Sequence, residues 1–390
     1  MRSLIRARCA ALILVAAAAC GDGSTGPDAP VGPLVAEVPI EPCYGIHDTY
    51  VRDGLAFVAA WNRGLQIYDV GDGRAGGSPA SPVLIGDVVP GGASSCSGGA
   101  RTHNSWWFHN PVSGEARYLF VGQEGPGAVG GTSSGDIYVV DVSDPANPVP
   151  VGSYHRDDAG THNFWVDEPN QILYAAYYNG GVVAIDVSGE LPADLSTREI
   201  ARTLPGGDAN TYTWGVMLHA GSVYASDMIS GLHQLRLEGG SFVHAGGGGN
   251  VEDRFTSDLW IHGDHGYTGT WGVRAEPGNT LYIWQLGAAG APSLIDSLSI
   301  GGVTTLSDVE VSADGSRLLV TAECGLCAEA GLYVYDLADP RRPERIGHYA
   351  VDTGLHTGTL ATIDGVLYAF TARNPADPAL MIFRVDALDP

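Results

Sequence analysis

A six-residue pattern recurs seven times along this chain of 390 residues, and it constrains the fold more than any other feature. Each copy is rich in β-branched and aromatic residues, is bounded by glycine and is too short for a helix. The fifth positions of the copies are 72, 45, 50, 49, 51 and 48 residues apart, and the long first spacing holds Gly/Ser-rich insertions near 90–100 and 125–135. The copies are Leu65–Val70, Ile137–Val142, Val182–Val187, Leu232–Leu237, Leu281–Leu286, Leu332–Leu337 and Leu380–Val385.

Further strand-like runs accompany most copies. A second run precedes the copy, as at 56–60, and a third precedes that one and ends in a turn such as Asp53-Gly54. A fourth run follows the copy, as at 83–88. Four strands in roughly 49 residues, with no helical segment, are typical of a propeller blade. We therefore expect an all-β fold, a seven-bladed β-propeller of four-stranded antiparallel blades, over residues 34–390.

The last blade lacks a fourth strand, because the chain stops soon after its third. An open edge would expose unpaired backbone groups. Residues 34–40 are strand-like and precede the first blade, and Pro39 suits an outermost strand, where one backbone N–H is not needed. We expect this N-terminal strand to close the ring on blade seven.

Two copies carry a longer signature, Asp-Pro-x-x-Pro followed by Gly-x-Tyr, at 141–154 and 336–349. This signature resembles the LVIVD repeat of bacterial and archaeal surface β-propellers. The six-residue core covers all seven repeats, whereas the extension matches fully in only two, and copies four, five and seven lack the Asp after the strand. The resemblance implies the fold and no shared biochemical activity. Because Pro fixes φ and Asp bonds nearby backbone N–H groups, we interpret the extension as a rigid turn.

The N-terminal residues predict where in the cell the protein is located. Arg2, Arg6 and Arg8 precede the short apolar run 10–19, which is followed by Cys20. This order is typical of a signal peptide, and Cys20 resembles the lipidated cysteine of a bacterial lipobox. We expect a signal peptide over 1–19, lipidation of Cys20 and a flexible tether over 20–33. The protein would then be an extracytoplasmic, membrane-anchored lipoprotein, periplasmic or at the cell surface; the alternative is simple secretion after cleavage near Ala19.

Charge excludes several partners and chemistries. The chain has 20 basic and 44 acidic residues, for a net charge of −24, and every basic residue is Arg. Such acidity argues against a nucleic-acid partner, and we expect contact with membranes through the lipid anchor only. The absence of Lys excludes lysine Schiff bases and P-loops that need Gly-Lys.

Polar residues at the starts of the first strands mark one face of the ring. These strands line the central channel, so their first residues should gather near the axis, together with the turns between second and third strands. Four of the seven strands start with histidine, a common transition-metal ligand. The candidate ligand-face residues are His47, Asp48, His103, Asn104, His162, Asn163, Trp214, Asp258, Asp308 and His356. If a metal binds, we expect His47, His103, His162 and His356 to hold it; otherwise they bond the neighbouring blades.

Four cysteines remain if Cys20 is acylated, and an oxidising compartment favours disulfides. Cys43 and Cys96 both lie shortly before first strands of adjacent blades, and Cys324 and Cys327 share one turn of blade six. We expect Cys43–Cys96 and Cys324–Cys327 pairs. The alternatives for Cys-x-x-Cys are a structural metal or a redox motif, although no helix is predicted to lower a thiol pKa.

Three functions are consistent with these observations. We expect a monomeric binding module, without a cofactor and without catalytic residues, that takes a protein or glycan ligand on its loop face. The first alternative is a metal-dependent oxidoreductase with an axial histidine-ligated metal. The second is a hydrolase or lyase that uses Asp258 and Asp308, which we place on blades separated by one other. No nucleophile elbow, zinc-protease motif or dinucleotide fingerprint supports an enzyme.

Overall fold

A computed structural model describes residues 33–387, apart from 93, 97, 250, 288–289 and 374–376. Within this part the strands form seven antiparallel sheets of four, which confirms the predicted seven-bladed propeller. Two short 3-10 helices, η1 (Leu195–Arg198) and η2 (Val385–Ala387), accompany them. Among the described residues, no helix has the length and apolar content needed to cross a membrane. The predicted signal peptide, Cys20 and all but the last residue of the tether lie outside the described residues.

The seven blades follow one another in chain order. Blade 1 consists of β2 (Asp48–Arg52), β3 (Leu55–Ala59), β4 (Leu65–Asp69) and β5 (Val83–Val88). Blade 2 consists of β6 (Thr102–Phe108), β7 (Tyr118–Gln123), β8 (Ile137–Asp141) and β9 (Val149–Tyr154). Blade 3 consists of β10 (Phe164–Asp167), β11 (Ile172–Ala176), β12 (Val182–Asp186) and β13 (Glu199–Thr203).

The remaining blades repeat this plan. Blade 4 consists of β14 (Thr213–His219), β15 (Ser222–Asp227), β16 (Gly231–Glu238) and β17 (Ser241–Gly247). Blade 5 consists of β18 (Phe255–His262), β19 (His265–Trp271), β20 (Thr280–Gly287) and β21 (Gly290–Ser299). Blade 6 consists of β22 (Thr305–Val311), β23 (Arg317–Glu323), β24 (Gly331–Asp336) and β25 (Glu344–Ala350). Blade 7 consists of β26 (Thr357–Ile363), β27 (Val366–Arg373), β28 (Ala379–Arg384) and β1 (Leu34–Pro39).

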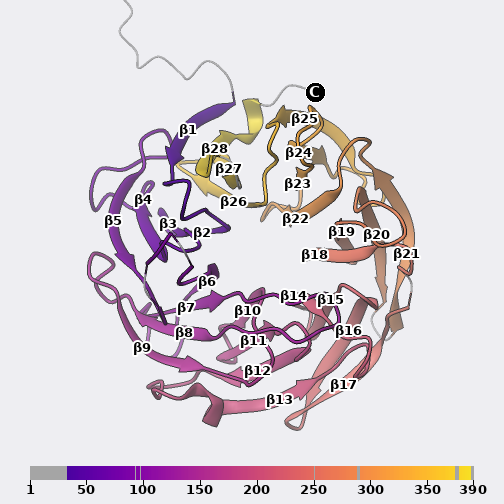
Figure 1. Cartoon of the computed structure of the whole chain (residues 1–390), viewed down its shortest axis with the longest axis horizontal. Coiled ribbons are helices and arrows are strands. Elements are labelled where there is room, and N and C mark those ends of the chain that lie inside the picture. The colour runs from indigo at the N-terminus through magenta and orange to yellow at the C-terminus, as the bar shows by residue number, and fades with distance from the viewer. Residues whose placement is uncertain are drawn as a thin grey trace, which may run out of the picture. The chain divides into compact units, whose positions relative to one another are not determined.

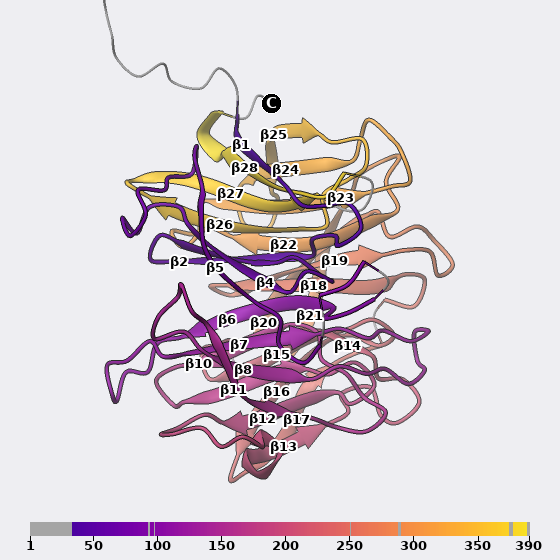
Figure 2. The same ribbon diagram turned by 60° about the vertical axis from the view of Figure 1, so that its left-hand side comes forward.

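The first strand of each blade lies innermost, around a central channel (Figure 1). Each of these strands contacts the first strand of the next blade, from β2 through β6 and onwards to β26, which contacts β2 again. The repeated hexapeptide forms the third strand, and its apolar residues fill the space between blades; Leu65 and Ile67 in β4, for example, are fully buried. Burial of both faces of the strand explains why the repeat reads as an almost continuous apolar run rather than an alternating one. The oblique view shows the blades following one another around the axis (Figure 2).

The N-terminal strand closes the ring, as predicted. β1 pairs with β28 antiparallel, with Glu37 opposite Met381 and Pro39 opposite Ala379. Beyond the strand, the Ile40 N–H donates to the carbonyl of Pro378 at 2.8 Å. The ends of the propeller therefore meet in one sheet, and the edge of blade 7 is covered.

Both predicted disulfides are present. Cys43 bonds Cys96, and Cys324 bonds Cys327. The first links the segment before β2 to the long segment before β6, so it joins two neighbouring blades on one face. The second closes a short turn between β23 and β24. No helix adjoins Cys324 or Cys327, so the thiol-activating environment of a redox motif is missing there.

Candidate functional site

Four of the seven inner strands pair irregularly near their starts, whereas β2, β10 and β26 pair regularly. The register of β6 shifts between Thr102 and Ser105, and that of β18 shifts between Thr256 and Leu259. β14 and β22 have comparable shifts near their first residues. A bulge breaks the alternation of faces along a strand, so two consecutive side chains can both point towards the axis. Sequence positions that a regular strand would separate are thereby brought together.

Four histidines converge at the axis. The Nε2 atoms of His47 and His356 lie 3.0 Å apart, and those of His103 and His162 lie 3.1 Å apart. The His47 and His103 rings, with centroids 4.1 Å apart, join the two pairs. A carboxylate oxygen of Glu124 lies 3.5 Å from His47 Nε2 and 3.9 Å from His103 Nε2. The ligand atoms of His47, His103 and Glu124 therefore all lie within 4.8 Å of one another, and His356 and His162 each adjoin this trio through one Nε2–Nε2 contact.

Three of these imidazoles are neutral at physiological pH. Burial, followed by the neighbouring histidines, holds the pKa values of His47 and His162 well below their usual range. Burial lowers the pKa of His103 to about 3. His103 and His162 are only 1% and 2% exposed. Among the described residues, the Nδ1 atom of His47 has no hydrogen-bond partner. Neutral imidazole is the form that binds metals, so the local environment prepares these side chains as ligands.

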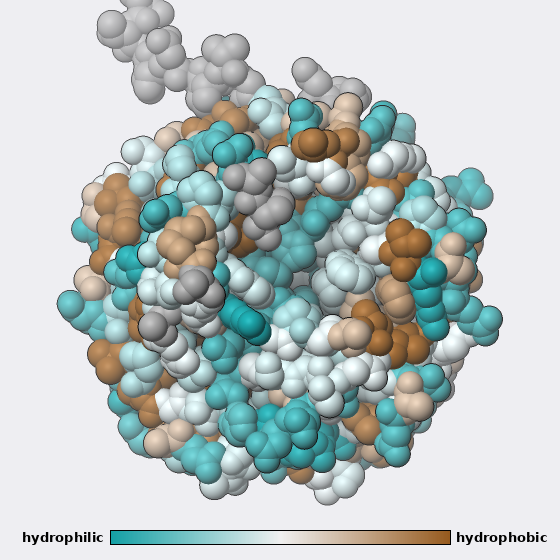
Figure 3. Space-filling view, viewed as in Figure 1, coloured by the Kyte–Doolittle hydropathy of each residue, from teal (hydrophilic) through white to brown (hydrophobic). Residues whose placement is uncertain are grey.

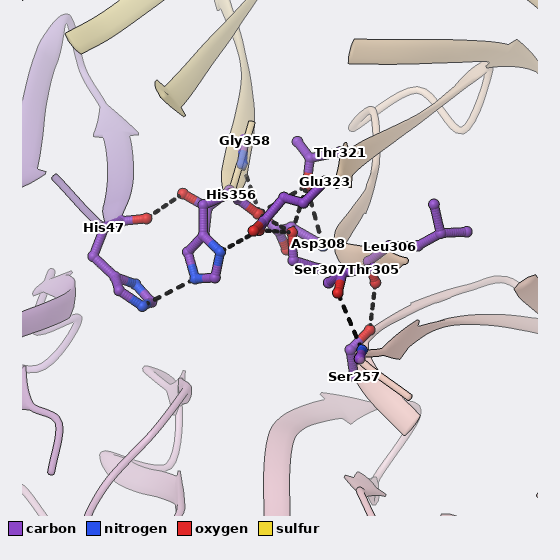
Figure 4. Close-up of polar contacts among 12 residues, drawn as sticks. His47, Ser257, Thr305, Leu306, Ser307, Asp308, Thr321, Glu323, His356 and Gly358 are labelled. Carbon is purple, nitrogen blue, oxygen red and sulfur yellow. Dashed lines mark hydrogen bonds and ion pairs between the residues drawn. The ribbon is translucent and has the colours of Figure 1, made fainter. Parts of the chain in front are cut away.

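The fourth histidine is oriented by a carboxylate. Nδ1 of His356 faces Glu323, which also accepts a hydrogen bond from the Ser307 hydroxyl at 2.9 Å (Figure 4). Burial acts to lower the pKa of His356, but the charge of Glu323 outweighs it and raises that pKa to about 9. Such a carboxylate–histidine pair is the usual means of fixing the tautomer and ring orientation of a metal-ligating histidine. Without a metal His356 therefore carries a proton at physiological pH, and its Nε2–H donates to Nε2 of His47 at 3.0 Å; binding of a metal at this nitrogen requires the loss of that proton.

Aromatic residues and Glu124 enclose the histidines from the loop side. The ring of Trp61 stacks on His47 with centroids 5.1 Å apart, and the ring of Trp214 lies 4.1 Å from that of His162. The hydroxyl of Tyr178 donates a hydrogen bond to Glu124. Burial raises the pKa of this glutamate, whose side chain is 8% exposed. The histidine cluster thus sits in a low-dielectric environment below the rim of the ring.

A cavity of about 210 Å³ lies in the channel next to the histidines. Its upper wall comes from the residues that directly follow the four histidines, Asp48, Asn104, Asn163 and Thr357, and from Asp258 and Asp308. The face shown in Figure 3 is hollowed at its centre, and hydrophilic residues surround the hollow. The ten residues predicted for the ligand face therefore lie around one channel, mostly below its rim.

The two carboxyl groups predicted as a catalytic pair do meet, but the predicted blade separation was wrong. Asp258 and Asp308 belong to β18 and β22, which are neighbours, and their side chains share a hydrogen bond. Asn163 Nδ2 donates to Asp258 Oδ1 at 2.7 Å, and the backbone N–H of Gly358 donates to Asp308 Oδ2 at 2.7 Å. Burial and the neighbouring Asp308 raise the pKa of Asp258 well above its usual range.

The donor set at the axis fits a transition metal. The ligand atoms of His47, His103 and Glu124 are close enough to reach one ion, and all three side chains are largely buried. The 3.0 and 3.1 Å separations within the histidine pairs are hydrogen-bond distances. A second group of potential ligands, Glu41, Cys43 and Cys96, does not fit, because both cysteines are in a disulfide.

Several residues of the site were not among the predicted ligands or their partners. Glu124 directly follows β7, in one of the turns that the sequence places on this face, but it was not predicted as a ligand. Glu323 is the last residue of β23, at the corresponding place in blade 6, and this shared position is the signal that could have found it. Trp106, Trp165 and Trp260, deeper in the channel, gave no such signal, since an inward aromatic residue in a strand usually belongs to a core.

Comparison with known proteins supports the fold assignment. The LVIVD repeat model matches residues 47–89 and 131–156, which cover much of blade 1 and the outer half of blade 2. No curated protein matches the chain. The matched regions contain His47 but none of the other three axial histidines. The similarity therefore concerns the repeat and says nothing about the function of the site. The chain is therefore a seven-bladed β-propeller that contains LVIVD repeats.

Proposed function

We propose that this protein binds a first-row transition-metal ion on the propeller axis through His47, His103 and Glu124, with His162 and His356 as further ligands once they turn away from their hydrogen bonds to this trio. The observation that carries the proposal is that the ligand atoms of His47, His103 and Glu124 all lie within 4.8 Å of one another, with Nε2 of His356 3.0 Å from that of His47 and Nε2 of His162 3.1 Å from that of His103. Hydrogen bonds join the Nε2 atoms in pairs, but the Nδ1 atoms of His47, His103 and His162 are buried without a partner among the described residues, at a cost of about 1–3 kcal/mol each. Hydrogen bonding within the cluster therefore accounts for only half of its buried nitrogens.

The donor set favours some metals over others. Imidazole suits iron, nickel, copper and zinc. Two imidazoles with one carboxylate are a donor set of iron sites that keep open coordination positions, so we expect iron first, and nickel or copper next. In this arrangement Glu323 would hold His356 in place, and Glu124 would supply negative charge to the ion. A redox-active ion with open coordination positions has the chemistry of the oxidoreductase that we gave as an alternative to a binding module.

Metal analysis of the purified protein tests the proposal. We expect about one iron, nickel or copper ion per chain, either as purified or after incubation with each ion and removal of the excess. His162→Ala and His47→Ala should lose the ion, whereas His262→Ala, which removes an exposed histidine at the end of β18, should keep it. Circular dichroism checks that each variant is folded. Should the wild-type protein bind none of these ions, or a folded His162→Ala protein bind them as well as the wild type, the proposal would be wrong.

We also propose that the protein is anchored by a lipid at Cys20, outside the cytoplasm. The disulfides and the LVIVD propeller fit an extracellular protein, and the order of basic residues, apolar run and cysteine at the N-terminus supports the anchor. Cys20→Ala removes the acylation site, so the variant should leave the membrane fraction in which the wild type is found. Equal membrane association of the two would refute the anchor. The predicted protein or glycan partner of the loop face stays a prediction.

A further inference from the structure

The channel beyond the histidines contains a chamber that the metal proposal does not use. The chamber is the cavity of about 210 Å³ described above, and every blade contributes to its wall. At roughly 30 Å³ per water molecule, it would hold on the order of seven waters or one small organic molecule. Its lining residues divide into two chemical groups, carboxyl groups and aromatic rings.

Four carboxyl groups line the chamber without a cationic side chain among them. They are Asp48, Asp258, Asp308 and Glu310, and the described lining includes no Arg or His. Their known partners are amide, hydroxyl and backbone groups or each other, as in the hydrogen bond between Asp258 and Asp308. The charged His356 lies outside the lining but acts on Asp48 and Asp308. The described lining itself contributes four carboxyl groups and no cationic side chain.

Aromatic rings form the other part of the wall, one level deeper in the channel. They follow one another in a row, with centroid distances of 5.4 Å from Tyr50 to Trp106, 5.1 Å from Trp106 to Trp165 and 6.0 Å from Trp165 to Trp260. All four are only partly buried although they lie on the innermost strands, because they border the cavity. The negative faces of aromatic rings attract cations, and indole attracts them most strongly.

Buried polar groups of the wall also lack partners. Asn104, 4% exposed, has no hydrogen-bond partner for its Oδ1 atom among the described residues, and the same holds for Oγ of Ser105, 6% exposed. Both residues line the chamber. Unpaired polar groups in a cavity that is otherwise negative and aromatic are what an absent hydrogen-bonding ligand would leave behind.

We propose that this chamber binds a small organic ammonium ion, with the positive group held between the carboxyl groups and the row of tryptophans. Two features distinguish this ligand from other occupants. A divalent metal ion needs several oxygen ligands around it, and potential ligand atoms of three carboxyl groups do not come close enough together here to form a metal site among the described residues. A neutral ligand would leave the buried carboxyl groups protonated and gain no charge attraction from them, whereas a cation favours their ionised form.

Calorimetry with choline and its neutral isostere, 3,3-dimethylbutan-1-ol, tests the inference. The two molecules have nearly the same shape and differ in charge. We expect choline to bind the full-length protein at least about tenfold more tightly than the alcohol, because both the cation–π and the charge contributions need the positive centre. Equal affinities, or no binding of choline, would overturn the proposal, and so would binding of Ca²⁺ without binding of choline.

Matched variants locate the binding. Asp258→Asn keeps an oxygen that can accept from Asn163 but cannot ionise when a cation binds, and Trp165→Leu removes one aromatic face; each should weaken choline binding about tenfold. Asp208→Asn, on an exposed loop, is the same substitution and should have no effect. Wild-type affinity in folded Asp258→Asn and Trp165→Leu proteins would contradict the proposal. Choline binding by His162→Ala would show that the chamber does not depend on the metal, so the two proposals fail separately.

Discussion

Closure of the ring by β1 can be tested with a single buried side chain. Ile40 directly follows β1, is 6% exposed and packs in the same cluster as Phe370, Leu380 and Ile382 of blade 7. Ile40→Ala removes three carbon atoms, worth about 0.8 kcal/mol each, and leaves a cavity, so the free energy of unfolding should fall by about 2–5 kcal/mol. At about 2.1 cal/mol/K per residue over roughly 355 residues, this is a drop of about 3–7 °C in melting temperature.

Thermal unfolding followed by circular dichroism measures the change. The matched control is Val243→Ala on β17, another outermost strand, where the valine is 37% exposed and its truncation should cost little. If the last blade were held by its own three strands alone, Ile40→Ala would behave like the control. Equal melting temperatures of the two variants would therefore refute the reasoning that the N-terminal strand completes blade 7.

Two further predictions concern single carboxylates. Glu323→Gln should weaken metal binding about 10–100-fold by releasing His356, measured by competition with a chelator, whereas Glu344→Gln on the exposed end of β25 should not; unchanged affinity would show that Glu323 does not position the ligand. Burial acts to raise the pKa of Asp69, but hydrogen bonds from the backbone N–H groups of Gly71, Asp72, Ala75 and Gly77 hold it below the ordinary value. A lowered carboxyl pKa stabilises the fold above about pH 4 and is lost as pH falls, so Asp69→Asn should cost about 1.5–3 kcal/mol at pH 7 and much less near pH 2. An equal loss at both pH values, measured by thermal unfolding, would contradict this assignment.

The sequence predicts the ring well because the information for it is repeated. Seven copies of one hexapeptide identify seven third strands. Segment 34–40 belongs to none of the seven repeats, so it is the strand available to pair with the open edge of blade 7. Both disulfide pairs follow from the same reasoning, since the repeat places Cys43 and Cys96 on one face. The blade count and the closing strand depend on patterns that are apolar, periodic and tolerant of errors in single positions.

The site is predicted less completely because it depends on departures from the repeat. The starts of the inner strands identify His47, His103, His162 and His356, but the bulges that turn consecutive residues towards the axis leave no periodic signal. The partner of His356 is Glu323, the last residue of β23, and only the packing of blades 6 and 7 brings the two together. The direct contact between Asp258 and Asp308 was not predicted either. Their blades are neighbours, whereas the sequence analysis placed another blade between them.

The starts of the inner strands have a consequence for how function is conserved among related proteins. The hexapeptides that form the third strands of the propeller and the residues that line its central channel are different parts of each repeat. Evolution can therefore keep the hexapeptides while the channel residues change. A protein that shares only the LVIVD pattern with this chain would share its architecture and need not share its chemistry. A shared function should instead be expected in chains that keep histidines at the starts of four neighbouring inner strands. Such chains should also have carboxylates at the positions of Glu124 and Glu323, where the second strands of their blades end.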